Sequence, residues 1–161
     1  MLTRSLGASG LQVSVLGFGG APLGNLYTPI SDDEARDTLA AALNSGFNFF
    51  DTAPHYGAGL SERRIGDAIR GSEIESCIVS TKVGRLLYPE VNADVQTLRH
   101  GFMTPMPFEQ RYDYSYDGIM RSWEDSLTRL GLASVEILLV HDIGIETHRE
   151  LHRDRWIELT A

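Results

Sequence analysis

Short apolar runs alternate along the chain with longer stretches in which apolar residues recur every three or four positions. The runs are rich in aliphatic and aromatic residues and carry few polar ones, a pattern typical of strands that are buried on both faces. The runs cover residues 15–20, 47–51, 77–81 and 135–140. We therefore predict four short core strands separated by helices.

The first predicted helix has the clearest boundaries. Ser31 and Glu34 stand three positions apart just before an apolar stripe, which is the pattern of a capping box. Gly46 follows the stripe, where a C-terminal cap is expected. Two further helices are predicted from similar stripes, one beginning at Ser61 and one over residues 119–130.

The segments outside this alternation are less regular. Residues 2–15 alternate weakly around a Ser-Gly turn, which predicts a β-hairpin at the N-terminus. Residues 84–114 contain three prolines, and we predict a long irregular loop of the kind that is usually functional or disordered. Residues 142–161 are polar, and we expect them to be partly helical around 149–159.

The order of strands and helices indicates an α/β fold. Strands that alternate with helices form a parallel sheet with right-handed crossovers. The pattern itself is compatible both with a doubly wound sheet and with a barrel. At 161 residues, the chain is long enough for one domain with its own core, which we place over residues 1–161.

Charge and composition narrow the range of partners and compartments. The formal net charge of −8 argues against nucleic acids and anionic membranes, which bind clustered Lys and Arg. The single cysteine, Cys77, excludes an internal disulfide. No apolar signal core stands at the N-terminus, and no apolar run approaches the ~20 residues of a membrane span. We expect a cytoplasmic protein that does not act on membranes.

Polar residues follow three of the predicted strands and suggest a catalytic site. Asp51, Lys82 and His141 come directly after successive strands, and Tyr56 lies in the loop after Asp51. Parallel strands end at one edge of the sheet, so these side chains are expected to meet there. Singly, each residue has an ordinary explanation, as a turn former, a packing residue or a solvated side chain. Their convergence favours chemistry.

Together these residues suit the reduction of a carbonyl group by hydride. The developing alkoxide needs a proton, which Tyr56 could supply as general acid. A tyrosine has a pKa of about 10, and an ammonium within hydrogen-bond reach lowers it. We assign that role to Lys82, held by Asp51, while His141 would orient the carbonyl.

The chain resembles the aldo-keto reductase family. The matching stretches are residues 16–20, 46–57, 61–66, 79–83 and 138–141, and the second contains the family's pattern Gly-x-x-x-x-Asp-Thr-Ala-x-x-Tyr-Gly complete. The resemblance implies a parallel (β/α)8 TIM barrel and an NAD(P) cofactor. It also implies a catalytic tetrad on Asp51, Tyr56, Lys82 and His141. Residues 20–25 and the long loop are most similar to sugar- or pyridoxal-oxidising members.

By the same resemblance, several residues are expected to contact ligands. Gly20, Ala21 and Asp51 would contact the cofactor, and His55, Tyr56 and His141 the substrate, an aldehyde, ketone or sugar. We also expect aromatic side chains of the long loop to line the substrate pocket. These are Phe102, Phe108, Tyr112 and Tyr114.

The family barrel needs eight strands and about 250 residues. The four predicted strands correspond to the first half of that barrel, truncated after the fourth strand. Most cofactor contacts of the family lie in the other half. Half a barrel exposes a strand edge, so we expect self-association or pairing with a C-terminal half.

Two alternative functions remain open from the sequence. Asp51, His55 and His141 could hold a metal ion in a barrel hydrolase, although we predict no metal site. His148 and His152 are four residues apart, and we interpret them as solvated histidines on a polar helix. The chain could also be a non-catalytic partner subunit. A dinucleotide-binding Gly-x-Gly-x-x-Gly pattern fails because Pro22 occupies the third glycine position.

Overall fold

The computed structural model describes residues 1–72 and 77–161. Its centre is a four-stranded parallel sheet, with the strands in the order β3-β4-β5-β8. The strands are β3 (Phe18–Gly19), β4 (Phe49–Asp51), β5 (Ile78–Val83) and β8 (Ile137–Val140). All four predicted core strands are therefore confirmed, most with shorter boundaries, whereas β5 extends past the predicted 77–81 and includes Lys82, which was expected to follow it.

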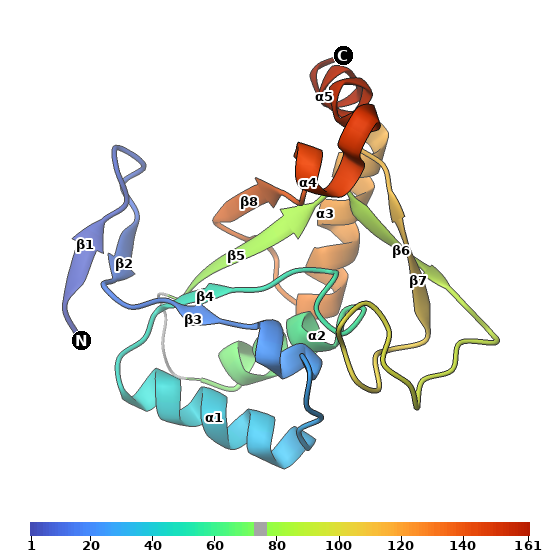
Figure 1. Ribbon diagram of the computed structural model, residues 1–161. Coiled ribbons are helices and arrows are strands. Elements are labelled where there is room, and N and C mark those ends of the chain that lie inside the picture. Colours follow the sequence, from blue (N-terminus) through green and yellow to red (C-terminus); the bar gives the residue numbers. More distant parts are fainter. Residues whose placement is uncertain (73–76) are drawn as a thin grey trace.

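The strand order separates the two fold classes that the sequence pattern left open. The strands are added in one direction without reversal, whereas a doubly wound sheet reverses direction at its switch point. With right-handed crossovers, every connecting helix then lies on the same side of the sheet. Figure 1 shows the three long helices together on that side, as in one half of a (β/α)8 barrel. They are α1 (Asp32–Asn44), α2 (Leu60–Arg70) and α3 (Tyr116–Leu130).

The core lies between the helices and the sheet. Phe50 and Val79 on the strands pack in one buried cluster with apolar residues of all three helices. The helix residues of this cluster are Ala35, Leu39, Ala42, Leu43, Ile65 and Leu130. Apolar positions at i, i+4 and i+7 along α1 give that helix the buried stripe that the sequence predicts.

The helix boundaries follow the expected local chemistry with two differences in where helices begin. Helix α3 begins at Tyr116, with Ser115 as its N-cap, and not at residue 119. The capping box of Ser31 and Glu34 is present at the start of α1, and Gly131 ends α3 in a left-handed conformation. The second helix, however, begins at Leu60 with Gly59 as its N-cap, not at Ser61. Ser61 therefore lies inside the first turn of α2, and its hydroxyl donates to the carbonyl oxygen of Gly20 at 2.7 Å.

The prediction of an irregular loop over residues 84–114 is wrong at both ends of the segment. Strand β6 (Arg85–Pro89) pairs antiparallel with β7 (Phe108–Tyr112). Prolines normally argue against strands, but here Pro89 ends β6 and Pro107 immediately precedes β7. The prolines therefore mark the ends of a hairpin and do not interrupt it.

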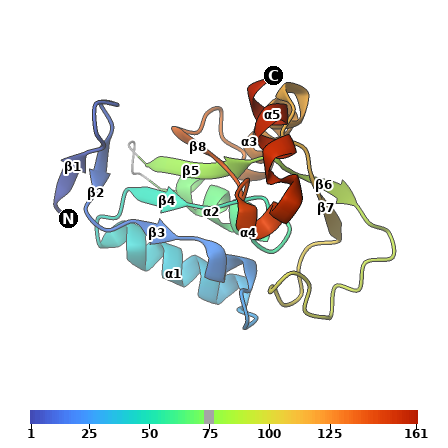
Figure 2. The same cartoon turned by 45° about the horizontal axis from the view of Figure 1, so that its top comes forward.

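The terminal segments agree with the sequence analysis. Strands β1 (Thr3–Ser5) and β2 (Gln12–Ser14) form the predicted N-terminal hairpin. The C-terminal segment contains α4 (Ile145–His148), the 3-10 turn η2 (Arg149–Leu151) and α5 (His152–Thr160). Figures 1 and 2 place β1–β2 at the amino end of the sheet and β6–β7 near its carboxyl end.

At the sheet's last strand, apolar side chains face solvent. Leu138, Leu139 and Val140 of β8 are 37–46% exposed, and β8 is the final strand in the sheet order. Association through this edge stays a prediction. Among the helices of the described ranges, none has the length and apolarity needed to cross a membrane.

Candidate functional site

Three of the four predicted tetrad residues lie at the carboxyl ends of the parallel strands. Asp51 ends β4, Lys82 is the penultimate residue of β5, and His141 directly follows β8. The Lys82 ammonium donates to the Asp51 carboxylate at 2.7 Å and to the Thr52 carbonyl oxygen at 2.9 Å. Ser80 also donates to Asp51, at 2.9 Å. The predicted ion pair is therefore present, and it is largely enclosed, with the Lys82 side chain 13% exposed.

Tyr56 lies in the turn after β4 and faces the same group. Its ring centroid is 4.9 Å from the Lys82 ammonium and 6.2 Å from the His141 ring centroid. The described hydrogen bonds of Lys82 go to Asp51 and Thr52. The expected hydrogen bond from Lys82 to the Tyr56 hydroxyl thus stays a prediction, while the proximity of the two side chains is observed.

The site contains a second histidine that packs against the first. The rings of His55 and His141 are 5.6 Å apart. Burial, reinforced by the positive charge of Arg85, lowers the pKa of His55 to about 4 and that of His141 to about 3. Both rings are therefore neutral at physiological pH.

Arg85 is the functional candidate that the sequence analysis missed. Its guanidinium lies 3.0 Å from Nδ1 of His55, donates to Gln110 at 3.2 Å and forms an ion pair with Asp142. It also lies 4.8 Å from the ring centroid of Tyr112. Its position three residues after Lys82 was the signal that could have found it, but the segment from residue 84 was predicted as a loop. Nothing in the sequence indicated that Asp142 adopts a positive φ of 50°.

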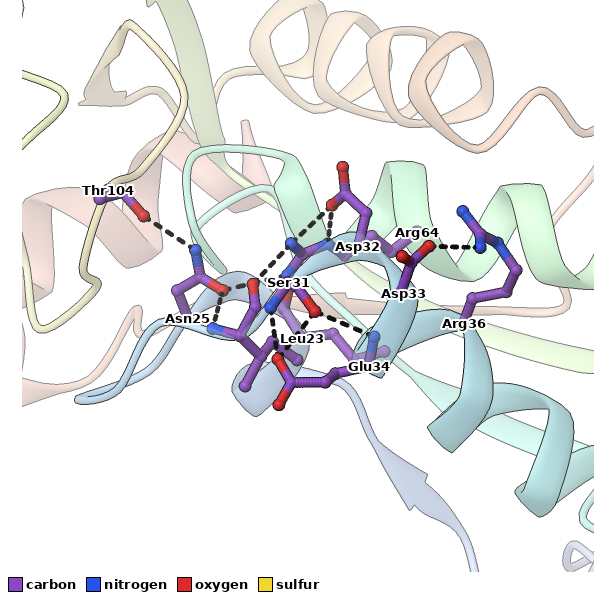
Figure 3. Close-up of polar contacts among 10 residues, drawn as sticks. Leu23, Asn25, Ser31, Asp32, Asp33, Glu34, Arg36, Arg64 and Thr104 are labelled. Carbon is purple, nitrogen blue, oxygen red and sulfur yellow. Dashed lines mark hydrogen bonds and ion pairs between the residues drawn. The ribbon is translucent and has the colours of Figure 1, made fainter.

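A tight turn packs closely against the backbone of Tyr56. The 3-10 helix η1 (Ala21–Gly24) follows β3, and a Cβ at Gly24 would lie 2.5 Å from the carbonyl carbon of Tyr56. Arg64 of α2 holds this turn by donating to the carbonyl oxygen of Leu23 and to the side chains of Asn25 and Asp32 (Figure 3). Arg64 thus links Asp32, the first residue of α1, to the η1 turn that packs against Tyr56.

The two glycines at the end of β3 differ in how closely they pack. A Cβ at Gly20 would lie 2.7 Å from both the Asp51 carbonyl oxygen and the Ser61 hydroxyl, and the Gly20 N–H donates to that carbonyl at 2.7 Å. This close contact explains the glycine without a ligand. By contrast, Gly19 pairs with Asp51 across the sheet and has nothing within 4 Å of an added Cβ. Contacts of Gly20 and Ala21 with a cofactor stay predictions.

The aromatic residues of the long segment are divided between the site and the interior. Phe102 is buried, and its ring centroid lies 5.1 Å from that of His55 and 6.0 Å from that of Tyr56. Tyr112 lies beneath Arg85, whereas Phe108 begins β7 and no contact with the tetrad is described for it. Phe102 is therefore the residue of this group that the structure brings to the tetrad.

Two expectations about side chains near His141 are wrong. Tyr114 is fully buried, so it cannot line an open pocket. Its hydroxyl donates to the carbonyl oxygen of His141 at 2.7 Å and lies 2.9 Å from Nε2 of His148. His148 is consequently a buried, hydrogen-bonded residue and not a solvated one, because its ring packs against those of Tyr112 and Tyr114.

Within the described residues, no group of three His, Cys, Asp or Glu side chains is arranged to hold a metal ion. Asp51 is instead engaged by Lys82, and Nδ1 of His55 by Arg85 and Gln110. These contacts give the metal-hydrolase alternative no support from geometry.

Comparison with known sequences finds relatives over nearly the whole chain. A pyridoxal 4-dehydrogenase from Microbacterium luteolum is 43% identical over 98% of this chain and 48% of its own length. A D-threo-aldose 1-dehydrogenase from a Pseudomonas species is 41% identical over 84% of this chain and 42% of its own. The chain thus spans about half the length of the curated relatives it matches.

Comparison with solved structures gives the same result. The holo form of an aldo-keto reductase from Bacillus halodurans superimposes with a TM-score of 0.68 at 29% identity, covering 99% of this chain and 46% of that one. A glycerol dehydrogenase from Gluconobacter oxydans superimposes with a TM-score of 0.65 at 26% identity, covering 94% and 45%. The sequence model described as the aldo/keto reductase family matches residues 15–160. The chain therefore belongs to the aldo/keto reductase family.

Proposed function

We propose that this chain carries the proton-transfer site of an NAD(P)-dependent oxidoreductase that interconverts a carbonyl and an alcohol. The observation that carries the proposal is the Asp51–Lys82 ion pair, with the ammonium 4.9 Å from the ring centroid of Tyr56. This arrangement holds a positive charge beside the Tyr56 ring at the open end of the strands. Such a charge stabilises the tyrosinate that forms when the hydroxyl gives up its proton.

Each tetrad residue then has a distinct role. Tyr56 donates its proton to the carbonyl oxygen in reduction and accepts it back in oxidation. Lys82 is held in place by its bonds to Asp51 and Thr52. His141, neutral and beside Tyr56, donates a hydrogen bond to the same substrate oxygen and fixes its direction.

The site residues fit the nicotinamide end of a cofactor, which supplies or accepts the hydride when bound. Gly19 leaves open space beside Asp51, so a flat ring could approach the backbone there. The holo form of the structurally similar Bacillus halodurans protein is consistent with cofactor binding in this fold. On this proposal, Gly20, Ala21 and Asp51 contact the cofactor from this half of the barrel.

The substrate proposed is a polar aldehyde, ketone or sugar. Two relatives with more than 40% identity are named for dehydrogenation of pyridoxal and of aldoses. In this chain His55, Gln110 and Arg85 place polar groups next to the tetrad. These polar side chains favour substrates with hydroxyl groups near the reacting carbon over purely aliphatic substrates.

The proposal extends to the protein's partners and location. Residues that complete the barrel would cover the exposed edge of β8, supplied by a C-terminal half or by a second copy of the chain. The net charge of −8 favours small-molecule partners over nucleic acids. With a single cysteine, a cytoplasmic location is proposed.

A chimera tests the proposed function. This chain would replace the matched part of the Microbacterium luteolum pyridoxal 4-dehydrogenase, and turnover of pyridoxal and aldoses would be followed by nicotinamide absorbance. We expect Tyr56→Phe to lower kcat by about 10²–10⁴-fold while cofactor binding persists. Tyr27→Phe is the matched control, since Tyr27 is 77% exposed. A folded, cofactor-binding chimera without turnover, or one unaffected by Tyr56→Phe, would overturn the proposal.

A further inference from the structure

Arg85 occupies an unusual position for a charged residue. Its side chain is 9% exposed, and its guanidinium contacts His55 of the candidate site and Asp142, the residue after His141. One terminal nitrogen lies 3.0 Å from Nδ1 of His55, and the other pairs with the carboxylate of Asp142. Burying an arginine is costly unless its charge is paired and hydrogen-bonded. The contacts with His55 and Asp142 supply that pairing and hold Arg85 at the strand ends.

Asp142 connects Arg85 to the second histidine. Its Oδ2 atom binds Arg85 and also lies 3.6 Å from Nε2 of His141. A carboxylate beside one ring nitrogen favours the tautomer that carries its proton there. An unpaired carboxylate would also favour the positively charged, fully protonated ring. The positive charge of Arg85 cancels most of this preference for a charged ring, while the preference for the Nε2–H tautomer remains.

The remaining charged and titratable groups around His141 act in the same direction. Lys82 of β5 and His55 of the loop after β4 both disfavour a positive charge on the ring, as does burial, while Asp142 is the group that favours it. Tyr56 also faces the ring at 6.2 Å. Around His55, Nδ1 is shared by Arg85 and Gln110, and His100 lies 6.3 Å away.

We propose that Arg85 is a positioning residue: by binding Asp142 and His55 together, it holds His141 neutral with its proton on Nε2. His141 is then ready to donate that proton in a hydrogen bond to the substrate oxygen. This inference rests on the proposed function only for its purpose, because the tautomer and charge of His141 are properties of the chain itself. It also assigns a role to the β6–β7 hairpin, which brings both Arg85 and Gln110 to the strand ends.

Histidine titration by nitrogen-15 NMR on the 161-residue chain tests the proposal directly. His141→Gln assigns the resonance. We expect His141 to remain neutral down to about pH 4, in the Nε2–H form. In Arg85→Gln the freed carboxylate should raise the His141 midpoint by about 1–2 pH units. Adding Asp142→Asn should reverse the rise. Arg99→Gln is the matched control, because Arg99 is 16% exposed and pairs with Glu109 instead.

Asp142→Asn alone covers the case in which Arg85→Gln does not fold. Without the carboxylate, His141 should keep its low midpoint and lose its preference for the Nε2–H form. A His141 midpoint that does not move in Arg85→Gln, or an Nδ1–H tautomer in the unaltered chain, would overturn the proposal.

In the active chimera, the acidic limb of the kcat/KM profile should move with the His141 midpoint in Arg85→Gln and return in the double variant. If Tyr56→Phe leaves turnover intact while the titrations behave as expected, the proposed function fails and the positioning role stands. If turnover depends on Tyr56 but the His141 midpoint does not move in Arg85→Gln, the positioning role fails and the proposed function stands.

Discussion

The buried ion pair between α2 and α3 should control the stability of the strand that carries Lys82. The Glu62 side chain is 0% exposed and the Arg129 side chain 11% exposed, and the two groups are 2.5 Å apart. Glu62 also accepts a hydrogen bond from Thr81, the residue before Lys82, at 2.7 Å. Arg129→Met would leave the carboxylate buried with Thr81 as its remaining partner. Breaking a buried pair in this way typically costs about 3–5 kcal/mol.

That loss is a large part of the 5–15 kcal/mol that stabilises a typical domain. Urea unfolding followed by circular dichroism would measure it. The double variant Glu62→Gln, Arg129→Met should recover much of the loss, because no charge is then left buried. Arg36→Met is the control, since Arg36 pairs with Asp33 where both side chains are mostly exposed (68% and 84%). A cost below about 1 kcal/mol for Arg129→Met, or a double variant as unstable as the single one, would refute this reasoning.

Three further predictions concern the surroundings of the tetrad. Gly24→Ala should displace Tyr56, because the added Cβ would lie 2.5 Å from its carbonyl carbon, and kcat of the chimera should fall by about 10²-fold. Tyr114→Phe should lower the free energy of unfolding by about 1–3 kcal/mol in urea titrations, since the buried carbonyl of His141 loses its donor. Acidification should destabilise the chain: the pKa values of His55 (about 4) and His141 (about 3) lie below the ordinary 6.5, so the unfolded state binds more protons. The melting temperature should therefore fall as pH drops from about 6.5 toward 4, and His55→Gln should make this dependence shallower.

The sequence predicted the sheet and the long helices because their signals are local. The buried strand Ile78–Val83 begins with an apolar, β-branched pair, and the capping box of Ser31 and Glu34 is complete within four residues. The choice between a barrel and a doubly wound sheet was different, because it depends on the order in which strands pair in space. Hydrophobic periodicity carries no information about that order, and only the family resemblance favoured the barrel.

The same distinction explains what was found and missed at the candidate site. Asp51, Lys82 and His141 were found because parallel topology brings strand ends together. Arg85 was missed because its importance depends on a hairpin whose pairing is non-local, and Pro89 argued against a strand there. His148 was misinterpreted for a similar reason. It looked solvated on a polar segment, yet its partner Tyr114 lies 34 positions away in the sequence.

The site therefore has two layers with different origins. The tetrad comes from the ends of core strands and the turn after β4, where the core cluster around Phe50 and Val79 fixes the backbone. The groups that set the charge of the histidines, Arg85 and Gln110, come from a hairpin that shares little of that core. Changes in the hairpin can consequently alter the protonation of His141 without disturbing the strand ends. On the proposed function, this separation lets the strand ends keep one proton-transfer chemistry while the surrounding loops adjust its pH range and its substrates.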